Sequence, residues 1–179
     1  MKFSTRLTHS LLFALLISGC SPVENKQDYV TVGALLPLTG ADSDKGMRVL
    51  NGLQLAKREI NEKGGILGKK LDIIVLNDHG SERNALQQYM VLKEKDIAAI
   101  IVLNHSGVTL TIAKAAETDG IPIVSPSAVD LSFENQNEEL TDFDKSYLNH
   151  FSQIPLSDSV AAYRCVFALA ETINNTEKR

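Results

Sequence analysis

Hydrophobic and polar positions along the chain follow two alternating patterns, which together predict the fold class. Short aliphatic runs rich in β-branched residues indicate strands, because a strand covered on both faces is apolar at nearly every position. Apolar residues three and four positions apart indicate helices. The predicted strands cover residues 30–36, 71–76, 97–103 and 121–124. The predicted helices between them cover residues 47–60, 82–93 and 108–119.

Small residues mark the ends of these segments. Gly64 and Gly65 stop the first helix, Gly120 stops the third, and Ser81 can cap the start of the second. The resulting order βαβαβαβ favours an open, Rossmann-like parallel sheet with helices on both faces. We therefore predict an α/β fold.

The alternation breaks after residue 129. Residues 130–145 are rich in acidic side chains without apolar periodicity, which predicts an acidic surface loop. A calcium loop is the alternative, but it would need spaced Asp and Asn ligands and a central glycine. Beyond it, residues 147–151 suggest a short fifth strand and residues 157–174 a last helix.

Composition adds limits to this picture. The 179 residues are 44% hydrophobic and 22% charged, which fits one ordinary globular domain over residues 29–179. The net charge is −4, and no cluster of Lys and Arg follows the extreme N-terminus. Because nucleic-acid binding needs a basic surface, nucleic acid is an unexpected partner.

The first residues have the pattern of an export signal. Lys2 and Arg6 precede the apolar run 11–17, which is shorter than the ~20 residues of a comfortable membrane span. A retained transmembrane helix is therefore the weaker interpretation. Residues 17–20, Ile-Ser-Gly-Cys, resemble the lipobox of bacterial lipoproteins.

The lipobox resemblance implies a signal peptide over residues 1–19, acylation of Cys20, with palmitate among the acyl groups, and a polar tether over residues 20–28. The protein would then be exported and anchored to a bacterial membrane, on its periplasmic or cell-surface side. Several acyl chains on one residue give a durable anchor, whereas one chain binds only marginally. An ordinary signal peptide with a chance cysteine remains the alternative.

Cys165 is the second of two cysteines, so a mature lipoprotein has no intramolecular disulfide. Its apolar helical surroundings predict a buried, inert thiol.

Ligands of open α/β sheets bind beyond the carboxyl ends of the strands, which here are residues 37–45, 78–81, 104–109 and 125–129. Residues 36–40, Leu-Pro-Leu-Thr-Gly, match a sortase pentapeptide, but such a signal lies near the C-terminus before an apolar segment. We expect a strand that ends at Pro37 and a loop that lines one wall of a ligand cleft.

No cofactor is expected at these strand ends. The glycines at 33, 40 and 46 do not match the dinucleotide fingerprint, and Gly-Lys-Ser/Thr is absent from the sequence. His79, His105 and His150 lack the close spacing of a zinc site, so loop or surface positions are expected for them.

Residues 104–107, Asn-His-Ser-Gly, place a serine between a strand and a helix. The leading glycine of a hydrolase nucleophile elbow is missing, which argues against an enzyme. Instead, Ser106, Gly107 and Thr109 lie where free N–H groups and the helix dipole favour a carboxylate. The alternative is that Ser106 or Thr109 only caps the helix, and the two roles are compatible.

Three segments carry a resemblance to a known family. Residues 30–40, 46–78 and 100–128, with a looser continuation over residues 151–163, resemble the N-terminal lobe of the periplasmic branched-chain amino-acid binding proteins, the type I substrate-binding proteins of ABC transporters. The block at residues 61–71, with its paired glycines, is the most specific part.

That resemblance implies a two-lobed protein that closes over an amino acid, amide or urea-like compound and delivers it to an ABC permease of the inner membrane. This chain would supply the N-terminal lobe only, as a truncated or split product that binds amino acids weakly or not at all by itself. It would not be an enzyme. A ligand-sensing module of a receptor or regulator, and a non-functional remnant, are the alternatives.

The family also implies site residues. Ser106 matches the serine that binds the ligand carboxylate, with Gly107 beside it, and Ser127 and Ala128 match backbone contacts. Val129 stands in place of a threonine and Lys45 in place of an aromatic residue that closes over the ligand. Ser152 replaces a common arginine. These departures argue against a simple leucine-type ligand.

Overall fold

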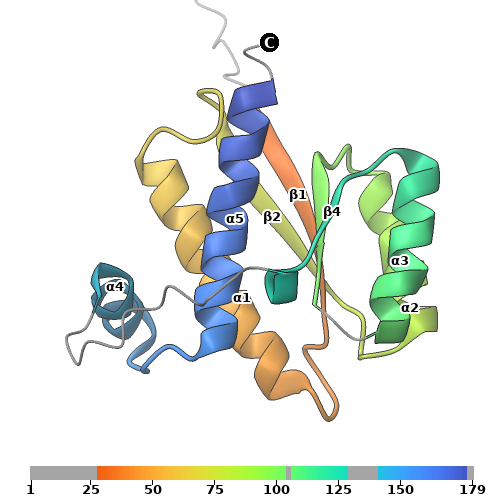
Figure 1. The fold of residues 1–179 in the computed structure, drawn as a ribbon, viewed down its shortest axis with the longest axis horizontal. Coiled ribbons are helices and arrows are strands. Elements are labelled where there is room, and N and C mark those ends of the chain that lie inside the picture. Colours follow the sequence, from red (N-terminus) through yellow and green to blue (C-terminus); the bar gives the residue numbers. More distant parts are fainter. Residues whose placement is uncertain (1–27, 104–105, 129–140, 177–179) are drawn as a thin grey trace, which may run out of the picture.

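The computed structural model describes residues 28–103, 106–128 and 141–176 (Figure 1). Four strands are described: β1 (Tyr29–Leu36), β2 (Lys70–Asn77), β3 (Ala99–Val102) and β4 (Ile123–Val124). The helices are α1 (Ser43–Glu62), α2 (Glu82–Lys93), α3 (Ser106–Asp119), α4 (Asp142–Phe151) and α5 (Ser157–Thr176), with a 3₁₀ turn η1 (Pro126–Ala128) after β4.

The strands form one parallel sheet in the order β2-β1-β3-β4, which confirms the predicted fold class. Helices α1 and α5 cover one face, and α2 and α3 cover the other (Figure 1). Strand β1 shows why, since its side chains alternate between faces. Val32 and Ala34 pack with the α1 and α5 core, whereas Leu35 packs with Tyr89 of α2.

Helix α1 ends as its sequence predicts. Gly65 has a φ of +81°, and an added Cβ would overlap the carbonyl oxygen of Lys69, so glycine is required there. Ser81 stands at the N-cap position of α2, although its side chain makes no capping hydrogen bond.

Residues 147–151 are helical, so the predicted fifth strand is wrong. They belong to α4, which starts with a capping box in which Thr141 Oγ1 accepts from the Asp144 N–H and the Asp144 carboxylate accepts from the Thr141 N–H. The last part of the predicted acidic loop, from Asp142, is also helical. The rest of that loop lies outside the described residues.

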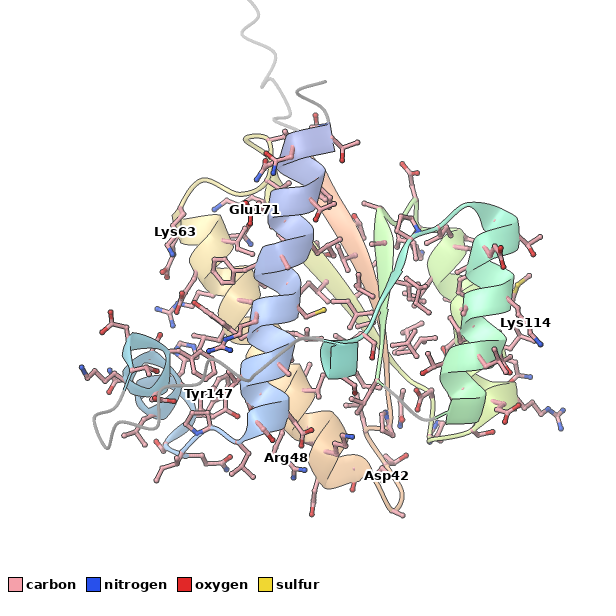
Figure 2. The ribbon with its side chains drawn as sticks, in the orientation of Figure 1. Asp42, Arg48, Lys63, Lys114, Tyr147 and Glu171 are labelled. Carbon is pink, nitrogen blue, oxygen red and sulfur yellow. The ribbon has the colours of Figure 1, made fainter. Side chains whose placement is uncertain are left out.

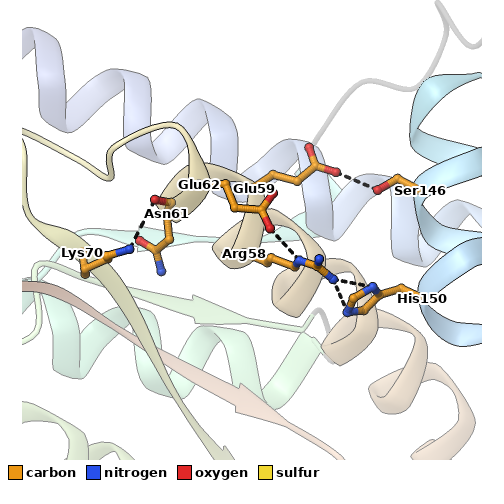
Figure 3. Close-up of polar contacts among 7 residues, drawn as sticks. All are labelled: Arg58, Glu59, Asn61, Glu62, Lys70, Ser146 and His150. Atoms are coloured by element: carbon orange, nitrogen blue, oxygen red, sulfur yellow. Dashed lines mark hydrogen bonds and ion pairs between the residues drawn. The ribbon is translucent and has the colours of Figure 1, made fainter.

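Helix α4 packs against α1 and α5 (Figure 2). Figure 3 shows Arg58 of α1 bridging Glu62 and His150, with its Nη1 2.7 Å from His150 Nδ1, while Ser146 donates to Glu59 at 3.0 Å. Tyr147 is 1% exposed and accepts hydrogen bonds from Asn51 and Ser159. These contacts join the three helices on one face of the sheet.

Cys165 is buried in α5, as predicted, and burial raises the pKa of its thiol to about 11. Within residues 28–103, 106–128 and 141–176, no helix combines the length and apolar character needed to cross a membrane. The predicted signal peptide and Cys20 lie outside the described residues.

Candidate functional site at the carboxyl edge of the sheet

All four strands are parallel, so their carboxyl ends meet at one edge of the sheet, at the bottom of Figure 1. The loop after β1, the loop after β2 and the turn η1 lie at this edge, as does the start of α1. Segments that the sequence placed at separate strand ends are therefore neighbours in space.

The loops after β1 and β2 are joined by hydrogen bonds. The Asp78 N–H donates to the Leu36 carbonyl at 3.0 Å, and the Leu38 N–H donates to Asn77 Oδ1 at 2.9 Å. Thr39 Oγ1 accepts from Asn77 at 3.0 Å and lies 2.7 Å from His79 Nδ1. The wall formed by residues 37–42 is thus fixed by side chains from β2 and the loop after it.

The start of α3 already has a carboxylate beside it. An added Cβ on Gly107 would overlap Glu82 Oε1, and the other oxygen of Glu82 accepts from Thr111 at 3.3 Å. Glycine at 107 therefore leaves room for the Glu82 side chain of α2. This carboxylate contributes negative charge near the positive end of α3, where the sequence predicts a ligand carboxylate.

Two buried hydroxyl groups near this edge remain available for hydrogen bonding. Thr109 Oγ1 in the first turn of α3 and Ser125 Oγ after β4 have no hydrogen-bond partner among the described residues. Because an unsatisfied buried hydroxyl is costly, such groups are candidates for contact with a ligand or water.

A cavity of about 130 Å³ opens at this edge between η1, the end of β3 and the first turn of α5. Its apolar walls include Val49, Leu103 and Ala161, and its polar walls are Ser127, Ser157 and Asp158. Asp158 is held by Arg48 of α1, whose Nε and Nη2 both donate to Oδ2, at 3.1 and 2.9 Å. Figure 2 shows Arg48 at the lower end of α1, next to α5.

The larger hollows lie elsewhere. One of about 430 Å³ separates α1 from α4, and one of about 680 Å³ lies beside the second half of α5. In the first, Arg58 contacts Glu62 and His150, and Glu59 accepts a hydrogen bond from Ser146. We place the candidate site at the carboxyl edge because the chain loops and free polar groups gather there.

The predicted site residues that the structure describes lie on different elements near this edge. Ser127 is exposed and lines the cavity, and Lys45 is half-buried in the first turn of α1. Ser106 and Gly107 begin α3, and Ala128 ends η1. Val129 lies outside the described residues. Their ligand roles remain predictions.

Sequence reasoning missed Asp158 and Glu82. The only local signal at Asp158 is an acidic residue in the first turn of a helix, which is common for helices that bind nothing. Its position beside Ser127 depends on how α5 packs on α1. Ser152, which stands where the family commonly has an arginine, ends α4 in a left-handed conformation with φ 54°.

The described histidines do not form a metal site at this edge. His79 belongs to the loop network and His150 to the α1–α4 contact, while His105 lies outside the described residues. In the part of the chain that the structure describes, no three His, Cys, Asp or Glu side chains gather in a way that could hold a metal ion.

Comparison with known proteins places this fold. The family model described as periplasmic binding protein matches residues 29–164. The Leu/Ile/Val-binding protein BraC3 of Rhizobium johnstonii is 30% identical over 68% of this chain and 33% of its own length. The Leu/Ile/Val-binding protein homolog 1 of Brucella abortus is 27% identical over 60% of this chain and 29% of its own.

Solved structures agree. The branched-chain amino acid transporter substrate-binding protein LivJ of Streptococcus pneumoniae, in complex with isoleucine, matches with a TM-score of 0.51 and 25% identity over 59% of this chain and 30% of its own. A putative branched-chain amino acid ABC transporter protein of Rhodospirillum rubrum shares the fold, with a TM-score of 0.54 and 22% identity over 58% of this chain and 30% of its own. The chain spans about a third of the length of the curated relatives it matches. Its match over residues 29–164 nevertheless shows that it belongs to the periplasmic binding protein family.

Proposed function

We propose that this chain contributes the first lobe of a substrate-binding component for an ABC transporter, and that it binds an amino acid or related amide at the carboxyl edge of its sheet. The observation that carries this proposal is the cavity beside Ser127, which opens at the carboxyl edge between η1, the end of β3 and the first turn of α5. Binding sites of open α/β sheets lie at this edge. The proposal requires no covalent chemistry, in keeping with a family of solute-binding proteins.

The family relationship gives the class of ligand. The relatives that match are named for Leu, Ile and Val binding, and the LivJ structure holds isoleucine. A ligand carboxylate placed at the start of α3 would be stabilised by N–H groups and the helix dipole. Lys45 near the same edge adds a positive charge where the family resemblance places an aromatic residue, so we propose a ligand other than a simple leucine-type amino acid.

Titration followed by NMR tests the binding proposal. We expect amino acids and their amides to shift amide signals at the strand ends at millimolar concentration, since an open edge does not exclude water as a closed cleft does. Ser127→Ala should weaken the shifts, whereas Thr172→Ala on the exposed side of α5 removes a hydroxyl far from the cavity and should leave them unchanged. The binding proposal would be refuted if no amino acid or amide shifted the amide signals at the strand ends. Micromolar affinity of the chain alone for any of these ligands would refute the expectation of weak binding.

Export and anchoring are a separate proposal. We infer that Cys20 is acylated after removal of residues 1–19 and that the protein acts outside the cytoplasmic membrane beside its permease. The expected result is a membrane-bound protein whose N-terminal peptide carries acyl mass, and Cys20→Ala should release it. A processed but unmodified Cys20 in the mass spectrum would instead support an ordinary signal peptide.

A further inference from the structure

We propose that Asp158 binds the cationic amine of the ligand, so that this chain carries its own amine-binding carboxylate on α5. The inference rests on the proposed function and deepens it, because it names the chemical group that the cavity takes. The Asp158 carboxylate lies on α5. The ligand carboxylate is predicted to lie at the start of α3, which follows β3.

The geometry of Asp158 leaves one oxygen for a ligand. Both Arg48 hydrogen bonds go to Oδ2, and no hydrogen bond within the described part of the chain reaches Oδ1. A carboxylate has lone pairs for about four hydrogen bonds, so two donors on one oxygen do not saturate it. The Asp158 side chain is 25% exposed, which keeps it reachable from the cavity.

Two hydroxyl-bearing residues line the same cavity as Asp158. Ser127 and Ser157 line the same cavity as Asp158, and neither hydroxyl is engaged within the described residues. A primary ammonium group donates three hydrogen bonds. One carboxylate oxygen and two hydroxyl oxygens supply that number of acceptors.

Size and charge limit the ligand further. A cavity of about 130 Å³ is close to the roughly 150 Å³ that admits benzene, so it takes about six heavy atoms. The apolar walls at Val49, Leu103 and Ala161 strengthen a charge pair by lowering the local dielectric. A small molecule with a primary amine matches this arrangement.

The test compares L-alanine with propionate, which lacks the amine, on the full chain by NMR titration. We expect L-alanine to bind at least severalfold more tightly, and Asp158→Asn to remove that difference. Glu117→Gln, which makes the same charge change on the exposed side of α3, should keep the difference. Circular dichroism of each variant establishes that the chain is folded.

A second variant separates ligand binding from a structural role. Arg48→Gln leaves the Asp158 carboxylate without its cation, so it should tighten L-alanine binding even as the α1–α5 contact weakens. A carboxylate that only holds α5 against α1 predicts unchanged or weaker binding in this variant. Equal binding of L-alanine and propionate would overturn the assignment of Asp158 while leaving the proposed function intact. A failure of both probes to bind would overturn the two proposals together.

Discussion

Gly52 of α1 lies directly against the backbone carbonyl of Ser159 in α5. An added Cβ at Gly52 would overlap the Ser159 oxygen and would lie 3.0 Å from the Ala162 Cβ. The two helices therefore cross at a distance that only glycine permits, and the polar walls of the cavity depend on this crossing.

Gly52→Ala should destabilise the protein. Overpacking against a backbone atom costs about 1–3 kcal/mol, which exceeds the gain of about 1 kcal/mol from replacing a helical glycine. The measurement is the free energy of unfolding in urea. Gly107→Ala is the matched control, because the atom it meets is the end of the flexible Glu82 side chain, so stability should stay equal or rise. Equal losses in both variants would contradict this account of the helix crossing.

Tyr147→Phe should lower stability by about 1–3 kcal/mol, because it leaves the buried Ser159 hydroxyl without its acceptor. The ring is retained, so the aromatic contacts with Phe143 and Phe151 remain. Urea unfolding measures the loss. Adding Ser159→Ala to Tyr147→Phe should recover part of it, and strictly additive losses would show that the two hydroxyl groups are not coupled.

Glu82→Gln should strengthen the binding of carboxylate ligands at the start of α3. Two unit charges about 4 Å apart repel by about 1 kcal/mol in water, which corresponds to roughly a fivefold change in affinity. Titration with propionate and L-alanine at low salt measures it. Glu94→Gln at the far end of α2 is the control for net charge. Equal gains in both variants would mean that only net charge matters.

Cys165 should resist alkylation in the native protein. The thiolate is the reactive form, and the raised pKa of about 11 together with burial suppresses it near neutral pH. Because the folded pKa lies above the ~8.5 of a free thiol, this group's stabilising contribution is present below that value and falls as pH rises towards 11. Peptide mapping after iodoacetamide treatment at pH 8, with and without urea, checks it. Fast labelling of Cys165 without urea would contradict its burial.

Much of the fold could be predicted from the sequence because its signals are local. Strand β1 and helix α2 follow from apolar runs and spacing, and their ends agree within a residue. Strand β3 proved shorter than its apolar run, since Ile97 and Ala98 precede the ladder. Helix α4 is hard to predict because charged residues interrupt its helical repeat at Phe143, Tyr147 and Phe151, although the Thr141–Asp144 capping box marks its start.

The candidate site was only partly predictable for a different reason. The sequence could bring the strand-end loops to one edge, because parallel strands place those loops together. Asp158 joins Ser127 only through the packing of α5 on α1, which depends on the close approach at Gly52 and the pair with Arg48. No spacing in the sequence encodes such a long-range contact.

The parallel sheet also gives the molecule a direction. Every strand starts at the end of the sheet where β1 begins and finishes at the edge with the cavity (Figure 1). β1 has eight residues, so these two ends are separated by about 26 Å. If Cys20 is acylated, the membrane attachment joins the chain just ahead of β1. The cavity would then lie at the end of the sheet opposite the point where the tether joins the domain.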